Sequence, residues 1–137
     1  MIKTRPQCGL IFEDKKGRIL LQLRDDKPTI PYPNRWGTFG GQIEKGETPT
    51  KAIKREIKEE LNYNLVNPVY FGNFPFDGHD IHMFMKVSRN ITLKDLEVRE
   101  GQKGEFLSLK KLKSLKYAFN CKEIVQEYIR RFLKQST

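Results

Sequence analysis

The sequence has few of the residues that build disulfide frameworks and zinc sites. Among its 137 residues are two cysteines, Cys8 and Cys121, and two histidines, without the spacing of a zinc site. It also lacks the run of about 20 apolar residues that a membrane-spanning helix needs. The first residues have no apolar core of a secretory signal. We therefore expect a cytoplasmic protein that has no contact with a membrane.

Acidic residues are also comparatively few, since 17 Asp and Glu stand against 26 Lys and Arg, which gives a net charge of +9. The excess is greatest in residues 101–137, which hold nine Lys and Arg and three Glu. A basic surface attracts polyanions, which suits a nucleotide diphosphate and equally an RNA end. The alternative, that the lysines only keep the protein soluble, stays open.

The length and the 37% hydrophobic content favour a single domain over residues 1–137 with a core of its own. The segments that predict strands are 8–12, 18–24, 36–39, 66–74, 81–87 and 105–109. Three prolines exclude a central strand or helix from residues 25–35. Apolar spacing predicts one helix after Thr48 and another over about 120–134. These elements indicate an α+β sandwich with a mixed β-sheet between helices.

A glycine pair and a carboxylate cluster stand close together in the first half of the chain. Glu56, Glu59 and Glu60 lie three and four residues apart, so a helix places them on one face. Like charges that close repel each other, which indicates a cation among them. Mg²⁺ is the first choice and Mn²⁺ the second, because such ions prefer carboxylate oxygens. Gly40 and Gly41 have no Cβ, so their backbone can approach a metal or phosphate closely.

A solvated helix face, on which Arg55 pairs with Glu59, is the alternative interpretation of these charges. The spacing of the whole segment favours a functional site. Its members, in order along the chain, are Gly41, Glu47, Arg55, Glu56, Ile57, Glu59, Glu60, Asn62 and Tyr63. This order resembles the signature of the Nudix hydrolases, Gly-x5-Glu-x7-Arg-Glu-(aliphatic)-x-Glu-Glu-x-Gly-(aliphatic), over residues 41–63. Asn62 replaces the usual Gly, which is a mild change because Asn tolerates the left-handed conformation at a helix end.

The resemblance implies a Nudix-type α/β/α sandwich, with a mixed, curved β-sheet between helices, and a metal-dependent pyrophosphohydrolase. The catalytic residues that it implies are Glu47, Arg55, Glu56, Glu59 and Glu60. The metal ligands that it implies are the carbonyl of Gly40 and the carboxylates of Glu56, Glu59, Glu60 and Glu100. In the same comparison Arg55 orients the helix carboxylates, Glu47 steadies the loop, and Gly41 lies against the substrate. Which glutamate is the general base stays open.

Three further residues match the MutT-like branch of the family. Residues 99–109 resemble a segment in which the Glu of a Glu-Gly-Gln triplet is a metal ligand or base, which favours Glu100 and then Glu105. Arg24 matches a phosphate-contacting arginine, and a plain surface charge is the alternative. Asn120 matches an asparagine that reads a purine edge, although we favour a helix N-cap there. For residues 99–109 an ordinary polar loop is the alternative.

The predicted reaction is hydrolysis of a nucleoside diphosphate linked to another group, such as a nucleoside triphosphate, including an oxidised purine one, or a nucleotide sugar. One alternative is removal of pyrophosphate from RNA 5′ ends, and another is a non-catalytic nucleotide or RNA sensor. A nucleotide is therefore the expected partner, RNA is second, and a homodimer is left open. The aromatic residues that could include a stacking surface, most of them expected in the core or rim, are Tyr32, Trp36, Phe74, Phe76, Tyr117 and Phe119.

Overall fold

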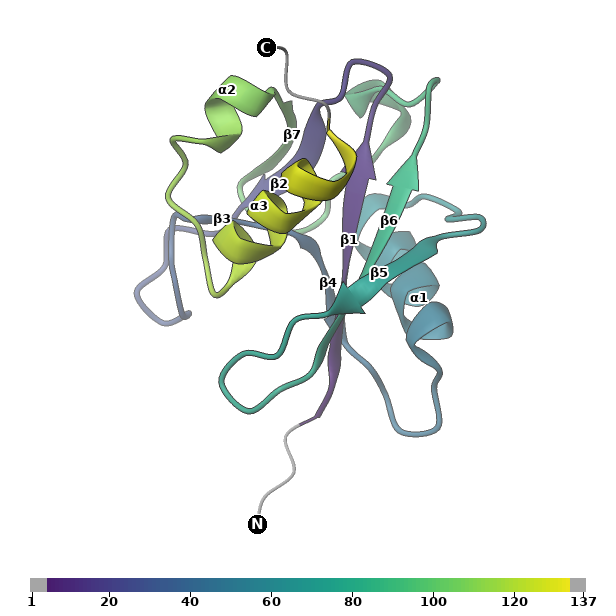
Figure 1. The fold of residues 1–137 in the computed structure, drawn as a ribbon. Coiled ribbons are helices and arrows are strands. Elements are labelled where there is room, and N and C mark those ends of the chain that lie inside the picture. The colour runs from purple at the N-terminus through teal and green to yellow at the C-terminus, as the bar shows by residue number, and fades with distance from the viewer. Residues whose placement is uncertain (1–4, 134–137) are drawn as a thin grey trace.

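The computed structural model describes residues 5–133. Its elements in chain order are β1 (Gln7–Glu13), β2 (Ile19–Leu23), β3 (Trp36–Gly37), β4 (Phe39–Gln42), α1 (Pro49–Leu61), β5 (Val69–Asn73), β6 (Ile81–Val87), the 3-10 helix η1 (Leu93–Asp95), β7 (Lys103–Leu107), α2 (Leu109–Leu112) and α3 (Cys121–Phe132). The strands form one mixed sheet, with α1 behind it and α2 and α3 in front (Figure 1). The predicted α/β/α sandwich is therefore confirmed.

Strand β1 organises the sheet, because it pairs with three other strands. Along one edge it runs parallel to β6 over its whole length. Along the other edge residues 7–10 pair with β4 and residues 12–13 pair with β2, both antiparallel. Strands β4 and β2 thus pair with successive parts of the same edge of β1. This arrangement brings the glycine pair of β4 directly beside the beginning of β1, with Gly40 opposite Gly9.

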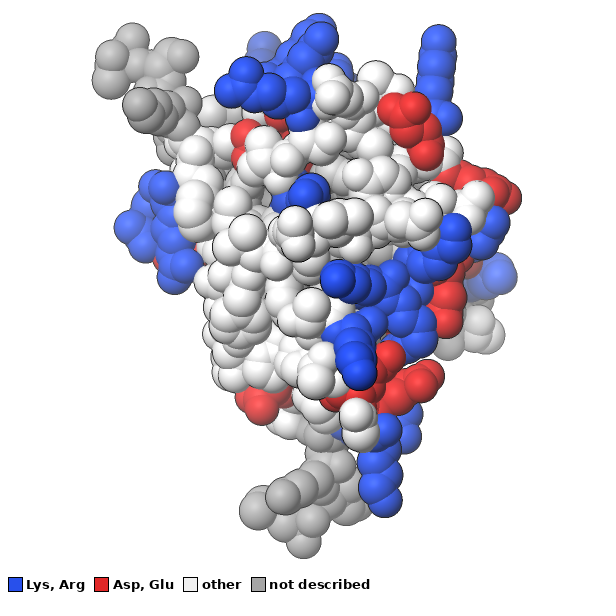
Figure 2. Space-filling model, turned by 90° about the vertical axis from the view of Figure 1, so that its right-hand side faces the viewer, with Lys and Arg blue, Asp and Glu red and all other residues white. Residues whose placement is uncertain are grey.

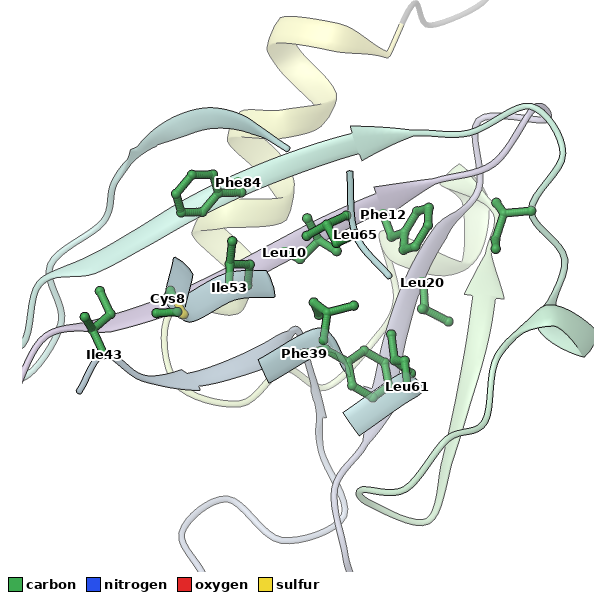
Figure 3. Packing of buried hydrophobic residues seen from close by; sticks show 13 residues of the cluster. Cys8, Leu10, Phe12, Leu20, Phe39, Ile43, Ile53, Leu61, Leu65 and Phe84 are labelled. Atoms are coloured by element: carbon green, nitrogen blue, oxygen red, sulfur yellow. The ribbon is translucent and has the colours of Figure 1, made fainter. Parts of the chain in front are cut away.

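Two hydrophobic clusters hold the helices on the sheet. Side chains alternate along β1, so that Leu10 and Phe12 face the cluster with α1 while Ile11 faces the cluster with α3. Figure 3 shows the first cluster, in which Ile53 and Leu61 of α1 pack with residues of the strands. Since both faces of β1 are covered, its central residues are buried without interruption.

The ends of α1 follow the local signals in the sequence. Thr48 is the N-cap, and its hydroxyl accepts a hydrogen bond from the backbone N–H of Lys51 at 3.2 Å, while Pro49 is the first helical residue. Asn62 ends the helix in the left-handed conformation, with φ 52° and ψ 40°. The apolar residues that α1 buries are Ala52, Ile53, Ile57 and Leu61, whose helical spacing puts them on one side. The opposite, charged side of the helix is thereby fixed in orientation.

Other boundaries differ from the sequence-based expectations. The last strand was expected at 105–109, but β7 ends at Leu107 because Ser108 caps the short helix α2 and accepts the N–H of Lys111 at 3.3 Å. Strand β4 continues through the glycine pair to Gln42, and residues 25–35 form neither strand nor helix. The last residue expected in the terminal helix, Lys134, lies outside the described residues.

The surface at the right of Figure 1 faces the viewer in Figure 2. Lys and Arg side chains on this face form several separate groups, with Asp and Glu among those at the right, around a large uncharged area. The large apolar side chains exposed on or beside β5 and β6 include Val66, Val69, Tyr70 and Val87. Within residues 5–133 no helix has the length and apolar character required to cross a membrane.

Candidate active site

Strand β4 and helix α1 meet where the two glycines face the carboxylates of the helix. The N–H of Gly40 donates to Oε1 of Glu60 at 2.8 Å. A Cβ on Gly41 would lie 2.7 Å from the carboxylate carbon of Glu56. A Cβ on Gly40, where φ is 152°, would lie 2.1 Å from the carbonyl oxygen of Cys8. Any side chain at these two positions would therefore displace either a carboxylate or the neighbouring strand.

Arg55 joins the helix carboxylates to the loop before α1. Its Nε and Nη2 donate to the two oxygens of Glu47 at 2.8 and 2.9 Å, and Nη2 also donates to the carbonyl of Gln42 at 3.0 Å. Nη1 donates to Glu56 at 2.8 Å and lies 3.5 Å from Glu59. The bond to Arg55 is the main cause that lowers the pKa of Glu47 to about 2. This geometry fits the orienting part that the resemblance implies for Arg55 and the loop-steadying part that it implies for Glu47.

Glu60 is the most confined carboxylate of the cluster. It is 5% exposed, and its Oε2 is a buried oxygen with no hydrogen-bond partner among the described residues. Burial raises the pKa of Glu60 well above its usual range, and the close approach of Glu100, with which a protonated Glu60 can share a hydrogen bond, and the charge of Glu56 raise this pKa further. Burial likewise raises the pKa of Glu56, where the charges of Glu59 and Glu100 add to the effect of burial. Glu59 itself is 59% exposed at the outer side of the helix.

Backbone hydrogen bonds carry Glu100 to this cluster. The N–H groups of Glu97 and Arg99 donate to the carbonyls of Leu61 and Glu60, at 2.9 and 2.8 Å, so the segment before Glu100 is fixed to the end of α1. Asn62 adds a side-chain bond of 3.3 Å to Glu97. The structure therefore places Glu100 near Glu56 and Glu60. Its part as a metal ligand or base stays a prediction.

The second choice, Glu105, lies elsewhere. Its carboxylate is 3.4 Å from both Lys103 and Lys111, and it lines a separate open cavity with Arg18 and Ser108. A carboxylate that pairs with two lysines outside the cluster adds no ligand to it. Glu105 is thus not brought together with the other predicted site residues.

The fit of a divalent metal ion can be tested on the carboxylates themselves. In residues 5–133 no three Asp, Glu, His or Cys side chains stand arranged as a completed metal site. Part of the reason is that Arg55 pairs with one oxygen of Glu56 and with one of Glu59, so these oxygens already have a partner. The buried oxygen of Glu60 without a partner, beside two further carboxylates, is nevertheless a place where a cation would relieve both desolvation and repulsion. The donor set of hard oxygens fits Mg²⁺ or Mn²⁺.

A cavity of about 390 Å³ opens on the side of the glycine pair that faces α3. Its wall includes Gly40, Gly41 and Glu100, so the carboxylate cluster adjoins it. This volume falls within the range of small-molecule binding sites. Among the other residues that line it are Gln22, Arg24, Thr38, Phe76, Asp77, His79, Phe119 and Asn120. The cavity thus combines polar groups with aromatic rings.

Arg24 and Asn120 both line this cavity, but each is engaged with the protein. Arg24 donates from Nε and Nη2 to the carbonyl of Pro31 at 3.2 and 3.0 Å. Asn120 stands at the cap position of α3, and yet its side chain makes no cap bond and donates to the carbonyl of Phe74 at 3.0 Å. The expected capping bond of Asn120 is therefore wrong, because a loop 46 residues away in sequence takes its amide.

Some residues of the cavity had no clear signal in the sequence. Gln22 is 3% exposed and donates to the carbonyl of Thr38 at 3.2 Å, although it stands in an apolar strand. A polar residue within such a run is the only signal that could have indicated it. His79 donates from Nδ1 to the carbonyl of Arg5 at 3.0 Å and lines the cavity. Cys8 also lines it, and burial raises the pKa of this thiol to about 12, which keeps it protonated.

Comparisons with known proteins agree with this geometry. The profile of the NUDIX domain matches residues 3–128. An uncharacterized Nudix hydrolase from Listeria innocua is 31% identical over 109 residues, which are 75% of this chain and 63% of that protein. The nucleoside triphosphatase NudI of Escherichia coli is 37% identical over 59 residues, 43% of this chain and 40% of that protein. The matched segments thus span less than two thirds of the length of either relative.

A solved structure of MutT, from a study of Aliivibrio salmonicida and Vibrio cholerae, superposes with a TM-score of 0.78 over 93% of this chain and 98% of that chain. At 22% sequence identity this likeness concerns the fold. The profile match, in contrast, rests on the sequence and extends far beyond the signature at 41–63. Because it covers nearly the whole domain, this chain belongs to the Nudix hydrolase family.

Proposed function

We propose that this chain hydrolyses a phosphoanhydride bond in a nucleoside diphosphate linked to another group, with a divalent metal ion at the carboxylate cluster. The observation that carries the proposal is the buried, unpartnered Oε2 of Glu60, beside Glu56 and Glu100 and next to the cavity. Ionising this buried group without a donor is costly, so a charged Glu60 needs a compensating partner. A cation that also contacts a diphosphate is such a partner.

The residues that would hold the ion are Glu56, Glu59, Glu60, Glu100 and the carbonyl of Gly40. When bound, the ion would neutralise charge on the phosphate oxygens and make an attacking water more acidic. Arg55 keeps Glu56 and Glu47 in place through the bonds described above, so the cluster is held in a fixed orientation. Without side chains at Gly40 and Gly41, β4 packs closely against β1 and the carboxylate of Glu56, and both glycines line the cavity.

A nucleoside triphosphate is the substrate class that we favour, cleaved to a nucleoside monophosphate and pyrophosphate. The name of the relative NudI, a nucleoside triphosphatase, supports this choice. The cavity volume of about 390 Å³ suits one nucleoside and its phosphates better than a long polymer. Nucleotide sugars share the same diphosphate and belong to the same test.

A hydrolysis screen tests the proposal. The panel contains canonical and oxidised purine nucleoside triphosphates, nucleotide sugars and 5′-triphosphorylated RNA, with Mg²⁺, with Mn²⁺ and with EDTA, and phosphate and pyrophosphate are measured. We expect release of pyrophosphate from nucleoside triphosphates, abolished by EDTA. Nucleotide binding without hydrolysis of any compound would contradict the proposal and favour the sensor. Release from RNA alone would favour the 5′-end activity.

A further inference from the structure

The most exposed apolar side chains of residues 5–133 gather around the edge strand β5. Among the large apolar side chains that are exposed there, five are 45% to 58% exposed and the remaining three are 39% to 41% exposed. The five lie on β5, just before it, at the end of β6 and at the end of α3. They are Val66, Val69, Tyr70, Val87 and Phe132, and we call them the β5 patch.

The β5 patch covers both faces of the sheet at this edge. The ring of Tyr70 lies 5.4 Å from that of Phe84, which belongs to the hydrophobic cluster with α1. The ring of Phe132 lies 5.8 Å from that of Phe71, which belongs to the cluster with α3. Strand β5 ends the strand order of the sheet, and no other strand of the described residues pairs with its outer edge. Apolar surface therefore flanks an open sheet edge on both sides.

The edge itself is protected against the addition of another strand. A bulge interrupts β5 between Tyr70 and Gly72. Nη1 of Arg131 donates to the carbonyl of Phe71 at 3.0 Å, and the guanidinium carbon lies 5.0 Å from the centre of the Phe71 ring. Bulges and charged side chains are devices that prevent open-ended strand pairing at a sheet edge. A partner of the β5 patch therefore meets side chains rather than the backbone of β5.

Polar groups next to the β5 patch have partners within the chain. Nζ of Lys86 donates to the carbonyl of Val66 at 2.6 Å. The hydroxyl of Tyr70 lies within hydrogen-bonding distance of Nδ1 of His82, at 2.8 Å. Contact with another surface would therefore leave neither the ammonium of Lys86 nor the hydroxyl of Tyr70 without a hydrogen bond, which lowers the cost of removing water from the patch.

We propose that the β5 patch is the interface of a homodimer, in which the patch of one copy packs against the patch of a second copy across a two-fold axis. Such an interface uses the same surface twice, so it needs no second complementary surface. Apolar and aromatic side chains with few charges are typical of the centre of homodimer interfaces. The proposal is independent of the proposed function, because all five patch residues lie outside the lining of the cavity.

The charge of the chain favours a second copy as the occupant of the patch. At a net charge of +9, two copies repel each other wherever their basic groups meet. Figure 2 faces the side of the molecule on which β5 and β6 lie, and it shows a large uncharged area with Lys and Arg groups around it. Contact through such an area keeps the basic groups of both copies at its rim, in water. A partner attracted by charge would be acidic and would bind the basic groups instead.

Sedimentation equilibrium of the full chain tests the proposal. We expect a mass near twice 16.1 kDa at about 100 µM. The dimer fraction should rise between about 50 and 500 mM KCl, because salt screens the repulsion between the copies. Val69→Arg places a like charge from each copy in the apolar contact and should weaken association by about 100-fold or more. Val87→Arg makes the same test from β6.

Leu93→Arg is the matched control, since Leu93 is an exposed apolar residue of η1, away from the patch, and this variant should dimerise like the wild type. Circular dichroism establishes which variants are folded. A monomeric wild-type chain at about 100 µM in both salt concentrations would overturn the proposal, and so would an unweakened dimer in either folded patch variant. Binding of a monomeric chain to phosphatidylcholine vesicles, lost in Val69→Arg, would assign the patch to a lipid surface and overturn it as well.

Discussion

At the scale of single residues, Glu60 makes the stability of the metal-free chain depend on pH. Its folded pKa is raised by burial and by nearby carboxylates, so between the unfolded value and the folded value the folded state binds more protons. The free energy of unfolding must then fall as pH rises above about 4.3, by at most about 1.4 kcal/mol per pH unit for one group. We expect a lower melting temperature at pH 8 than at pH 5 in EDTA.

The variant Glu60→Gln isolates this contribution, because the amide has no charge to bury. We expect it to flatten the pH dependence in EDTA and to lose most of any stabilisation by Mg²⁺. Glu123→Gln, an exposed carboxylate on α3, is the control and should follow the wild type. If Glu60→Gln keeps the wild-type pH profile, Glu60 is not the titrating group.

Arg55 is the residue whose geometry no other side chain reproduces. Arg55→Lys keeps the charge but loses the paired bonds to Glu47 and the bond to Gln42. We expect kcat/KM to fall by about 10- to 100-fold, as is typical when an orienting partner of metal ligands is removed. Lys54→Ala, an exposed cation on the same helix, should leave kcat/KM near the wild-type value.

Unfolding in acid is a second measurement on Arg55→Lys. Arg55 lowers the pKa of Glu47 to about 2, so this pair stabilises the fold above the unfolded pKa and the contribution is lost as pH falls towards 2. Arg55→Lys should therefore unfold at a higher pH in an acid titration followed by circular dichroism. Coincident acid transitions for the variant and the wild type would contradict the assigned bond.

At the scale of elements, the loop between β2 and β3 is an ordered part of the cavity wall that depends on Gln102. Removing its side chain in Gln102→Ala deletes the bonds to Arg24 and Asn34. One or two hydrogen bonds correspond to about 2- to 10-fold in the opening equilibrium of the loop. We expect limited trypsin digestion after Arg35, an exposed residue of this loop, to accelerate by that factor and KM to rise while kcat changes little.

Gln126→Ala removes an exposed glutamine from α3 and is the matched control. It should be cleaved at the wild-type rate. Equal cleavage rates in Gln102→Ala and the wild type would show that the loop is held by its backbone bonds alone, such as that from Asn34 to Asp25 at 3.1 Å.

The elements also differ in how far the sequence predicts them. Helix α1 is predicted completely, because Thr48, Pro49, the apolar spacing and Asn62 are all local signals. Helix α2 is not, since its four residues are too few to show a periodicity. The position of Glu100 follows from a family resemblance, but its cause is a pair of backbone bonds between segments distant in sequence. The side-chain partner of Asn120 depends on such a long-range contact as well.

At the scale of the whole molecule, binding through the net charge of +9 and binding within the cavity predict different effects of salt concentration on substrate affinity. A polyanion held by surface lysines loses affinity steeply as salt rises, because each neutralised phosphate releases counterions. Four such contacts to a single strand correspond to about a 50-fold loss between 50 and 200 mM KCl. A nucleotide held within the cavity depends mainly on local contacts, so its affinity changes far less.

Salt titrations at constant Mg²⁺ therefore discriminate between a nucleotide hydrolase and one that acts on RNA ends. For a nucleoside triphosphate we expect KM to change by less than about threefold over this range. For 5′-triphosphorylated RNA we expect a low kcat/KM that falls steeply as salt rises. Lys110→Ala with Lys111→Ala should then weaken the use of RNA and leave the nucleotide unaffected. On the face that Figure 2 shows, the basic groups are separate and partly interleaved with acidic ones. An RNA substrate that keeps its kcat/KM at 200 mM KCl and exceeds the nucleotide would reverse this conclusion.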